Sequence, residues 1–496
     1  MLAPKAVVDV SNFVPVADGT TNVTAAIHRA RDAAAPKLIF PAGIYLVSGL
    51  TANVAKQQWV FEPGATIKLA DSSNAALLSI TAAGVEIRGG QWNGNQANQS
   101  SGTDCIIVSR VASVVLDGLT VTNGKGYGIR ALHSDKVRIR NCDVSGSTNV
   151  GIFVEADAAQ ASDTYGPLIQ GCTVDRTALG SGINEGGIKV HGNTPRKVLR
   201  PRIIGNDVMM PNNPTASNAI AIEVWGGSDR ATITGNTTVG GYMSISVDNS
   251  PRSTVSGNTT YDAKQYGIEI ASSASCAVTG NTMDGNSLTT RGIVLDGASG
   301  SPGAAITGNT VRGCTSRSIY AIDADRCVIS GNTVDCSAGH AIYLQNLDHG
   351  TISGNMLYGT GTAAKAIWLD TSTGIVITGN DCFSFTENGV YLYATTAVTI
   401  SNIVITGNQF VSVNVAIGTA VSGGAALGSS VRVAGNVGVG DYADYNARVG
   451  FLTGTGSPEG VTTAGIGSIF RRTDGGTSTT LYIKESGTGN TGWIAK

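Results

Sequence analysis

Charged side chains are scarce in this sequence, and neither sign dominates. Asp, Glu, Lys and Arg together make up 14% of the 496 residues, and the formal net charge is −2. Such a surface lacks the basic field that attracts nucleic acid and the acidic tail typical of a disordered segment. The sequence also has no apolar run of the roughly 20 residues that a membrane-spanning helix requires. We therefore expect neither nucleic-acid binding nor insertion into a membrane.

Recognisable cysteine motifs and a leader sequence are missing as well. The eight cysteines are scattered without CxxC or metal-ligand spacing, and most stand in strand-like segments such as RNCDV and QGCTV. A buried, reduced thiol is the best interpretation of such positions, so we expect no metal site, no cofactor and no disulfide framework. The first residues, MLAPKAVVDV, do not have the pattern of a signal peptide.

What the sequence has in abundance is a repeat built on a Gly-Asn pair. A triplet rich in β-branched residues precedes each pair, as in ATITGNTTV and IVITGNDCF. The pairs recur every 22 to 30 residues, and their asparagines are Asn206, Asn236, Asn258, Asn281, Asn309, Asn332, Asn355, Asn380, Asn408 and Asn436. Each copy predicts a short strand, a turn and another short strand, because Gly and Asn both tolerate the left-handed backbone of a tight turn.

A second repeated segment, of the form GIxVx, lies between these pairs. Its copies include GIFVE, GIKVH, AIEVW, GIEIA and AIWLD, and most follow one another at intervals of 23 to 26 residues. A period in the low twenties with two or three strands per repeat is typical of a parallel β-solenoid, in which stacked rungs share one core. A propeller would need about 40–45 residues per repeat, and a leucine-rich repeat would show LxxLxL, so neither fits.

Segments of a different character bound the repeat. Residues 20–35, TTNVTAAIHRARDAAA, predict a short helix with Thr21 or Asn22 as its N-cap, which would cover the open end of the solenoid. After about residue 440 the repeat stops, and SIFRRT and TTLYIKE predict the strands of a hairpin around DGGTS. We expect an N-terminal segment with the capping helix at 1–36, the solenoid at 37–439 and a small β-rich module at 440–496.

Three segments carry a resemblance to a known family. They are residues 9–30 (DVSNFVPVADGTTNVTAAIHRA) with 37–50 (KLIFPAGIYLVSGL), the ITGN ladder, and the end of the chain from GSPEGVTTAGIGSIF to GTGNTGWIAK. The first segment resembles the opening of phage tailspikes, the ladder resembles their body, and the end of the chain resembles a short C-terminal module of phage tail proteins. These tailspikes are polysaccharide depolymerases of the pectate-lyase-like right-handed β-helix superfamily. The resemblance implies an all-β, right-handed parallel β-helix that forms a homotrimer through its C-terminal module. It also implies attachment to a phage tail or baseplate in the virion, and extracellular cleavage of a bacterial surface polysaccharide.

The GIxVx segments predict which side chains face outward. Their first Ile and fourth residue should point inward and the third and fifth outward, so that like positions form columns with about 4.8 Å per rung. The steps of 36 and 34 residues on either side of Lys189 are the longest, and such insertions would build walls beside it. We therefore expect a site where ionisable residues gather in these columns: Glu155, Lys189, His191, Glu223, Asp248, Glu269 and Asp296.

The C-terminal part of the first outward column is aromatic. It comprises Tyr320, Tyr343, Trp368 and Tyr391. Flat aromatic faces on a rigid wall suit pyranose rings, whose C–H faces are apolar. Because solenoids stack like residues, the column would also suit a simple surface ladder, or packing against a neighbouring chain of a trimer. The sequence leaves these interpretations open.

Hydrolysis of a glycosidic bond needs two carboxylates, one acid and one base or nucleophile. Glu223 and Glu269 should lie two rungs apart, about 9.6 Å, and Glu223 and Asp248 about 8 Å apart on the diagonal. Both spacings are closer to the inverting than to the retaining arrangement. Lys189, one rung from Glu223, would favour its ionised form, so we expect Glu223 as the base and Asp248 or Glu269 as the acid.

Other residues near these carboxylates are candidates for holding the polymer. Trp225 stands two residues after Glu223 and would provide an aromatic platform beside it. We expect Glu155, Arg130 and Asp296 to contact the substrate as well, together with the aromatic column.

Three alternatives remain open. In the first, β-elimination of a uronate polymer, Lys189 and His191 would act on the proton, and Arg130 or Arg196 would neutralise the substrate acid. The aspartate pattern of polygalacturonases, a calcium-binding Asp cluster and a GxSxG motif are absent. The second is a receptor-binding fibre without turnover. The third is a groove between subunits that would use Asp104, Asp117, Asp157, Asp323 and Asp325.

Overall fold

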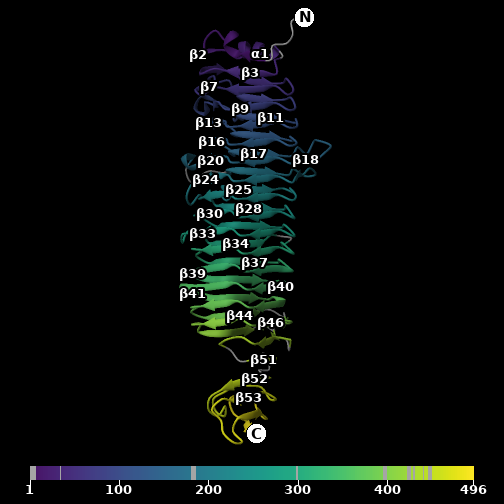
Figure 1. The fold of residues 1–496 in the computed structure, drawn as a ribbon, viewed down its shortest axis with the longest axis vertical. Helices are drawn as coiled ribbons and strands as arrows, with labels where there is room; N and C mark the ends of the chain where they lie inside the picture. The colour runs from purple at the N-terminus through teal and green to yellow at the C-terminus, as the bar shows by residue number, and fades with distance from the viewer. Residues whose placement is uncertain are drawn as a thin grey trace. The chain divides into compact units, whose positions relative to one another are not determined.

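The computed structural model describes residues 7–33, 35–179, 186–297, 300–394, 399–421, 426–427, 430–438, 441–444 and 449–496. The chain divides into two compact units, Met1–Ala277 and Val278–Lys496. Strands dominate both units, and the described residues contain a single α-helix. Figure 1 shows the strands of each unit stacked as successive coils. The predicted all-β parallel solenoid is therefore confirmed.

The first unit places the strands of each coil in three parallel stacks. The first stack holds β1 (Val8–Asp9), β3 (Lys37–Phe40), β6 (Gln58–Phe61), β9 (Glu86–Arg88), β12 (Val115–Asp117), β15 (Arg138–Arg140), β19 (Leu168–Gln170), β23 (Arg202–Ile204), β26 (Thr232–Thr234) and β29 (Thr254–Ser256). The second holds β2 (Asp18–Asn22), β4 (Gly43–Val47), β7 (Ala65–Leu69), β10 (Gln91–Asn93), β13 (Thr120–Thr122), β16 (Asp143–Ser145), β20 (Thr173–Asp175), β24 (Asp207–Met209), β27 (Thr237–Val239) and β30 (Thr259–Tyr261).

The third stack contains the GIxVx segments. It holds β5 (Leu50–Ala52), β8 (Leu78–Ile80), β11 (Ile106–Ser109), β14 (Ile129–Leu132), β17 (Ile152–Glu155), β21 (Ile188–His191), β25 (Ile220–Trp225), β28 (Met243–Asp248) and β31 (Tyr266–Ala271). Two insertions add a small parallel sheet of β18 (Thr164–Tyr165) and β22 (Val198–Leu199). Short 3-10 helices lie at Val10–Asn12, Gln96–Asn98 and Thr177–Leu179, and β32 (Ala277–Thr279) spans the boundary between the units.

Helix α1 (Thr24–Asp32) packs against the first coils through the buried side chain of Ile27. Arg31 donates from Nη1 to the carbonyl of Thr51 at 2.7 Å, which ties the end of the helix to β5. The N-cap is Val23, so the predicted caps Thr21 and Asn22 are wrong. Strand β2 extends through Asn22, and the chain turns into the helix one residue later; the Asn22 side chain still accepts a hydrogen bond from the N–H of Thr24 at 3.1 Å.

In the Gly-Asn turns, the glycine and the asparagine have different roles. Glycine takes the left-handed conformation, with φ of 62° at Gly205 and 65° at Gly235. The asparagines are buried and form a ladder, in which Asn206 Nδ2 donates to Asn236 Oδ1 at 2.9 Å and Asn236 to Asn258 at 2.9 Å. A similar ladder in the second unit joins Asn281, Asn309, Asn332, Asn355, Asn380, Asn408 and Asn436. Each buried amide is thus satisfied by its copy on the next coil.

The second unit continues the same kind of coil. One stack holds β35 (Ala305–Thr307), β38 (Cys327–Ser330), β40 (Asp348–Ser353), β42 (Thr373–Thr378), β46 (Val404–Thr406) and β50 (Arg432–Ala434). The others hold β33 (Thr282–Asp284), β34 (Arg291–Asp296), β36 (Thr310–Arg312), β37 (Arg317–Ile322), β43 (Asp381–Phe383), β44 (Asn388–Ala394), β47 (Gln409–Val411) and β48 (Val415–Val421). Strands β39 (Thr333–Gln345) and β41 (Met356–Asp370) run through both of these stacks, and β45 (Thr399–Ile400) pairs with β49 (Ala426–Leu427).

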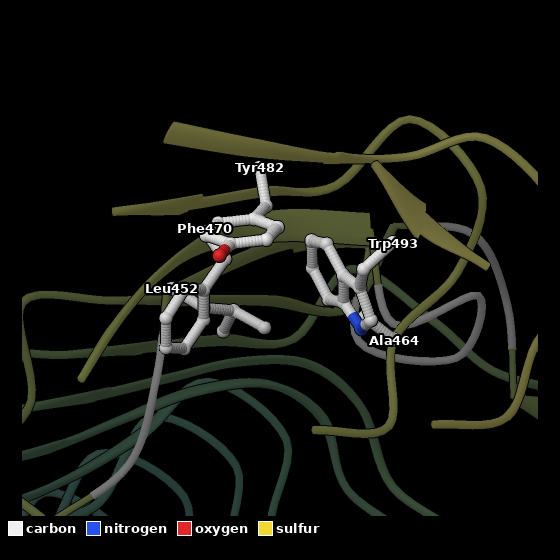
Figure 2. Close-up of a cluster of buried hydrophobic side chains, with 5 residues drawn as sticks. All are labelled: Leu452, Ala464, Phe470, Tyr482 and Trp493. Carbon is white, nitrogen blue, oxygen red and sulfur yellow. The ribbon is translucent and has the colours of Figure 1, made fainter. Parts of the chain in front are cut away.

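A small sheet follows the last coil of the second unit. It contains β51 (Asp441–Asp444), β52 (Val449–Gly454), β53 (Ile469–Arg472), β54 (Leu481–Lys484) and β55 (Trp493–Ala495). Strands β53 and β54 pair antiparallel, with Phe470 opposite Tyr482, so the predicted hairpin is present. Figure 2 shows the buried cluster behind them, formed by Leu452, Ala464, Phe470, Tyr482 and Trp493. This sheet therefore has a hydrophobic core of its own.

The interior of both solenoid parts is filled by the inward residues of the strands. Ile222 and Val224 of β25 are fully buried, as the GIxVx pattern predicts. All eight cysteines are buried and free, so the expectation of reduced, buried thiols is confirmed. Among the described residues, no helix is both long and apolar enough to cross a membrane.

Candidate functional site

The first unit contains a pocket lined by several of the predicted site residues. Its volume is about 440 Å³, and it lies on the outer face of β21, β25, β28 and β31. We call it the carboxylate pocket; the strand residues that line it include Lys189, Glu223, Trp225, Ser246, Asp248 and Glu269. Ser217 and Asn218 line it from the insertion between β24 and β25. That insertion thus supplies part of a wall, as expected.

The strand register brings these residues together. Lys189 lies opposite Glu223, Glu223 opposite Ser246, and Ser246 opposite Glu269 on successive coils. In the second column, Glu155 lies opposite His191 and His191 opposite Trp225. The two outward columns predicted from the sequence are therefore present in this unit. Ser246 stands in the first column and was missed as a site residue only because its side chain carries no charge.

Glu223 forms an ion pair at the centre of the pocket. Its Oε2 lies 2.9 Å from Nζ of Lys189, and the two side chains are only 12% and 14% exposed. The same ammonium lies 5.1 Å from the centre of the Trp225 ring. Both charges are largely removed from water, so each depends on the other, and loss of one partner would leave the other charge buried without compensation.

The other two carboxyl groups of the pocket have different environments. Burial raises the pKa of Asp248, against the lowering effect of hydrogen bonds from the Asn249 backbone and the Trp225 side chain. Glu269 accepts a hydrogen bond from the Ser246 hydroxyl at 2.7 Å. The pocket therefore holds one carboxylate paired with a cation and one carboxyl group that retains its proton to higher pH than usual. Such a difference between neighbouring carboxyl groups separates the acid from the base at glycosidase sites.

A series of stacked aromatic rings leads to the pocket from the preceding coils. Tyr127 stacks on Phe153 at 5.0 Å between ring centres, Phe153 on His191 at 6.3 Å, and His191 on Trp225 at 4.3 Å. Burial, together with the charge of Lys189, lowers the pKa of His191 to about 4. His191 is therefore neutral at neutral pH and packs as a flat ring. Trp225 is the last ring of this series; it is 38% exposed and lines the pocket.

Arg130 and Glu155 are paired with each other. The Arg130 guanidinium contacts Oε1 of Glu155, and its Nη1 also lies 3.4 Å from Oδ2 of Asp104. Burial raises the pKa of both carboxyl groups, against the lowering effect of Arg130. Neither Arg130 nor Glu155 lines the carboxylate pocket. Their role in substrate binding, and that of Asp104 in a groove between subunits, remain predictions.

Two of the other aspartates considered for such a groove are also engaged within the chain. Asp117 pairs with Arg140 and accepts from Asn141, and Asp157 pairs with Arg110. The insertion at 179–187, expected to form another wall beside Lys189, includes residues 180–185, which lie outside the described residues. Asp296 ends strand β34 in the second unit, and its predicted role is likewise untested.

The aromatic column of the second unit is present, with Tyr320 and Tyr343 buried and Trp368 and Tyr391 partly exposed. Tyr320 stacks on Tyr343 with 5.4 Å between ring centres, Tyr343 lies 4.7 Å from Trp368, and Trp368 lies 5.8 Å from Tyr391. The Arg317 guanidinium lies 4.3 Å from the centre of the Tyr343 ring. Tyr343 is consequently only 4% exposed. Packing of the rings under cations of the same chain was not among the alternatives drawn from the sequence; sugar binding and subunit packing by this column remain predictions.

Comparisons with known proteins follow the fold. Residues 63–237 match the family described as right handed beta helix region. Together with the parallel strand stacks, this match identifies the fold as a right-handed parallel β-helix. Residues 201–381 match the family described as NosD, a periplasmic copper-binding protein. Among the described residues no group of three or more His, Cys, Asp or Glu could hold a metal ion, and all eight thiols are buried. Copper favours clustered Cys, Met or His ligands, and the part of the chain that the structure describes offers no such cluster of Cys and His.

Solved structures with a similar fold come from several kinds of protein. The A-module of the mannuronan C-5 epimerase AlgE6 of Azotobacter vinelandii is 14% identical, with a TM-score of 0.41 over 85% of this chain and 99% of that one. The surface adhesin PfbA of Streptococcus pneumoniae is 15% identical, with a TM-score of 0.48 over 79% and 93%. Tailspike protein 3 of bacteriophage CBA120 is 13% identical, with a TM-score of 0.45 over 98% and 68%. None of the curated proteins matches this chain.

Proposed function

We propose that this β-helix protein is a tailspike depolymerase that binds a bacterial surface polysaccharide in the carboxylate pocket and hydrolyses it. One observation carries the proposal: Glu223, paired with Lys189, and Asp248, whose pKa burial raises, line one pocket beside an exposed indole. A base and an acid are the two groups that glycosidic hydrolysis requires. These two groups support the endo-acting hydrolase expected from the sequence.

In the proposed reaction the two carboxyl groups act on opposite sides of the glycosidic bond. Glu223 takes a proton from a water molecule, whose oxygen forms a bond to the anomeric carbon as the bond to the leaving sugar breaks. Asp248 gives its proton to the leaving oxygen, so charge and atoms balance. Lys189 keeps Glu223 ionised. Glu269, held by Ser246, orients a substrate hydroxyl.

Trp225 is the proposed platform for a sugar ring next to the cleaved bond. Its face is fixed by stacking on His191, so little side-chain entropy is lost when a sugar binds. The apolar face of a pyranose packs on the indole while its hydroxyls meet the carboxylates and Asn218 of the wall. A pocket of about 440 Å³ is within the usual range for such ligands.

The C-terminal sheet is the proposed trimerisation module of a virion-attached protein. Several large apolar side chains remain on its surface in the single chain, with Phe451 67% exposed and Val461 76% exposed. Exposed apolar surface of this kind is typical of a subunit interface. This feature supports a homotrimer. The phage tail or baseplate as a further partner, and the tail of the virion as the location, are part of the same proposal.

β-Elimination of a uronate polymer is the second candidate, and His191 favours it. With its pKa lowered to about 4, His191 is a neutral imidazole at neutral pH, and Lys189 lies close enough to depress that pKa. A neutral imidazole could remove the proton next to a uronate carboxylate while Lys189 stabilises the charge that develops. Its ring is held between Phe153 and Trp225, so this reaction requires the polymer to reach a ring edge.

Product analysis tests both candidates and the non-catalytic alternative. The protein is incubated with a panel of bacterial capsular and exopolysaccharides, and reducing ends, ultraviolet absorbance and product masses are followed. Hydrolysis yields new reducing ends and products that have each gained one water. Products with the absorbance of an unsaturated uronate would replace the hydrolase with the lyase. Polysaccharide that binds without any change in size distribution would show a receptor-binding fibre and refute both reactions.

A further inference from the structure

A second pocket lies on a different strand stack of the first unit. It has a volume of about 480 Å³ and lies beside β15, β23 and β26, where its lining includes Lys136, Arg138, Tyr165, Arg200, Arg202 and Arg230. We call it the basic pocket. It shares no lining residue with the carboxylate pocket, which lies on the stack of β21, β25, β28 and β31. Five of the chain's 33 Lys and Arg residues meet here, although charge is scarce elsewhere in the sequence.

The coil geometry explains why these cations meet. The N–H of Lys136 donates to the carbonyl of Tyr165, and the N–H of Arg200 to that of Asp229, so equivalent turn residues stack from coil to coil. In the adjoining strands Arg138 lies opposite Leu168, and Leu168 opposite Arg202. Neighbouring turn positions are therefore about 4.8 Å apart, and Arg138 and Arg202 about 9.6 Å apart along the stack. The result is a fixed array of positive charges.

The nearby carboxylates form backbone hydrogen bonds or pair with a cation outside this array. Asp135 accepts the backbone N–H of Tyr165 at 2.8 Å, and Asp163 accepts that of Lys197 at 3.0 Å. Asp229 is bound by Arg252, whose Nε lies 3.0 Å from Oδ1. Within the described part of the chain, no ion pair joins any of the five pocket cations. Their mutual repulsion is relieved only by solvent or by an anionic ligand.

Tyr165 adds an apolar surface to the charges. Its hydroxyl accepts a hydrogen bond from Nη1 of Arg200 at 3.1 Å, and the guanidinium lies 5.8 Å from the ring centre. The ring is held in place and exposed to solvent. Arginine forks bind carboxylate, sulfate and phosphate groups through paired N–H donors, and an aromatic face accepts the C–H face of a sugar. Single-stranded nucleic acid would instead favour a series of stacking rings, and this pocket offers one.

We propose that the basic pocket is a second binding site that holds an acidic polysaccharide through its carboxylate, sulfate or phosphate groups. The site is separate from the carboxylate pocket and does not depend on the reaction proposed there. It would retain a polysaccharide on the protein surface while another part of the same polysaccharide chain, or a neighbouring polysaccharide chain, occupies the carboxylate pocket.

The test measures binding of a fluorescently labelled oligogalacturonate by anisotropy at several salt concentrations. The triple variant R138Q/R202Q/R230Q should bind at least about tenfold more weakly, because each guanidinium supplies charge-assisted hydrogen bonds. It should also show a smaller dependence of affinity on salt. The control K56Q/R326Q/R432Q removes three exposed cations outside the pocket and should bind like the wild type. E223Q is measured in parallel, because it changes the charge of the carboxylate pocket and leaves the basic pocket intact.

Several results would overturn the site. One is that the triple variant binds oligogalacturonate as tightly as the wild type does. Another is that the control variant loses as much affinity as the triple variant. A third is that the wild type binds a neutral dextran of the same length as tightly as it binds oligogalacturonate. Tighter binding of a single-stranded oligonucleotide of equal charge would assign the pocket to nucleic acid instead. Loss of binding in E223Q alone would place the acidic ligand in the carboxylate pocket. Circular dichroism of each variant, compared with wild type, separates loss of binding from loss of fold.

Discussion

The carboxylate pocket of the first unit and the aromatic column of the second use the same positions of the same repeated segment. In the first unit, Glu223 and Trp225 project from β25 into a pocket, and the indole is exposed. In the second unit, Trp368 takes the position equivalent to Glu223, yet its column is covered by Arg317 and Lys365. The same strand geometry therefore yields an open pocket in one case and a packed ladder in the other.

The residue three positions before each outward residue of this column accounts for the difference between the open pocket and the packed ladder. In the first unit this position carries Ile220 opposite Met243, and Met243 opposite Tyr266, and no cation stands there. In the second unit the register places long polar side chains at this position on successive coils: Arg291, Arg317, His340, Lys365 and Asn388. Arginine and lysine reach over the neighbouring rings and pack on their faces. A column of outward residues is open only where the adjoining column does not cover it.

The largest expected effect separates the two Lys–Glu pairs of these regions. Glu223→Gln should lower the turnover of a susceptible polysaccharide by about 10³-fold, because the proposed base is lost. Glu387→Gln, which removes the partner of Lys365 in the aromatic column, should leave turnover unchanged. The measurement is the rate of reducing-end formation. Because E223Q leaves Lys189 unpaired, E223D serves as a second variant that keeps the charge; full activity in both would refute the role of Glu223.

The next effect contrasts the two tryptophans in stability. Trp368 packs against Tyr343, His340 and Tyr391, so Trp368→Ala should lower the free energy of unfolding by about 3 kcal/mol. Trp225→Ala should cost clearly less, because that ring is partly exposed. Denaturant unfolding followed by circular dichroism measures both. Equal losses would mean that the aromatic column is no more tightly packed than the pocket.

The third effect concerns substrate binding at the same two positions. Trp225→Ala should raise KM about tenfold with a smaller change in kcat, because it removes an aromatic face on which a sugar ring stacks. Stacking of a nucleic-acid base on an aromatic side chain, a comparable contact, is worth about 1–3 kcal/mol. Trp368→Phe, which retains a ring in the covered column, is the control and should leave KM unchanged. A rise in KM for W368F but not for W225A would transfer the sugar platform to the aromatic column.

The smallest expected effect is a change in how stability depends on pH. Burial raises the pKa of Asp248 in the folded protein, so the folded state binds this proton more tightly than the unfolded state. Stability from this group is present at low pH and falls as pH rises through the folded pKa. Asp248→Asn should therefore be slightly more stable than wild type at neutral pH, with the difference vanishing in acid. Melting temperatures across pH, with Asp207→Asn as an exposed-site control, test this sign.

Much of the pocket could be predicted because strand geometry is so regular. The third and fifth positions of GIxVx point outward, so Lys189, Glu223 and Glu269 had to share one face. The contributions of Ser217 and Asn218 could not be predicted, since the path of an insertion depends on packing rather than on period. The pairing of Arg130 with Glu155 was also missed, although the column order places them on adjacent coils.

The basic pocket illustrates the same limit. Its cations belong to the first strand stack and to the turns before it, and no single repeat contains more than two of them. Their approach depends on how the 36- and 34-residue coils stack and on where β18 pairs with β22. The Asn ladder was likewise hidden, because a Gly-Asn pair indicates a turn whether or not the amide is buried.

The sequence by itself determined the parallel solenoid, the order of its outward columns and the residues available for acid and base chemistry. These follow from period alone, because a two-residue alternation and a coil of nearly constant length leave the backbone little choice. Only the tertiary structure decided which column is open, which charges are paired and which carboxyl group of the pocket has a raised pKa. Those properties depend on side-chain reach, burial and contacts between coils, such as Lys189 on Glu223 and Arg317 on Tyr343, that no single repeat encodes.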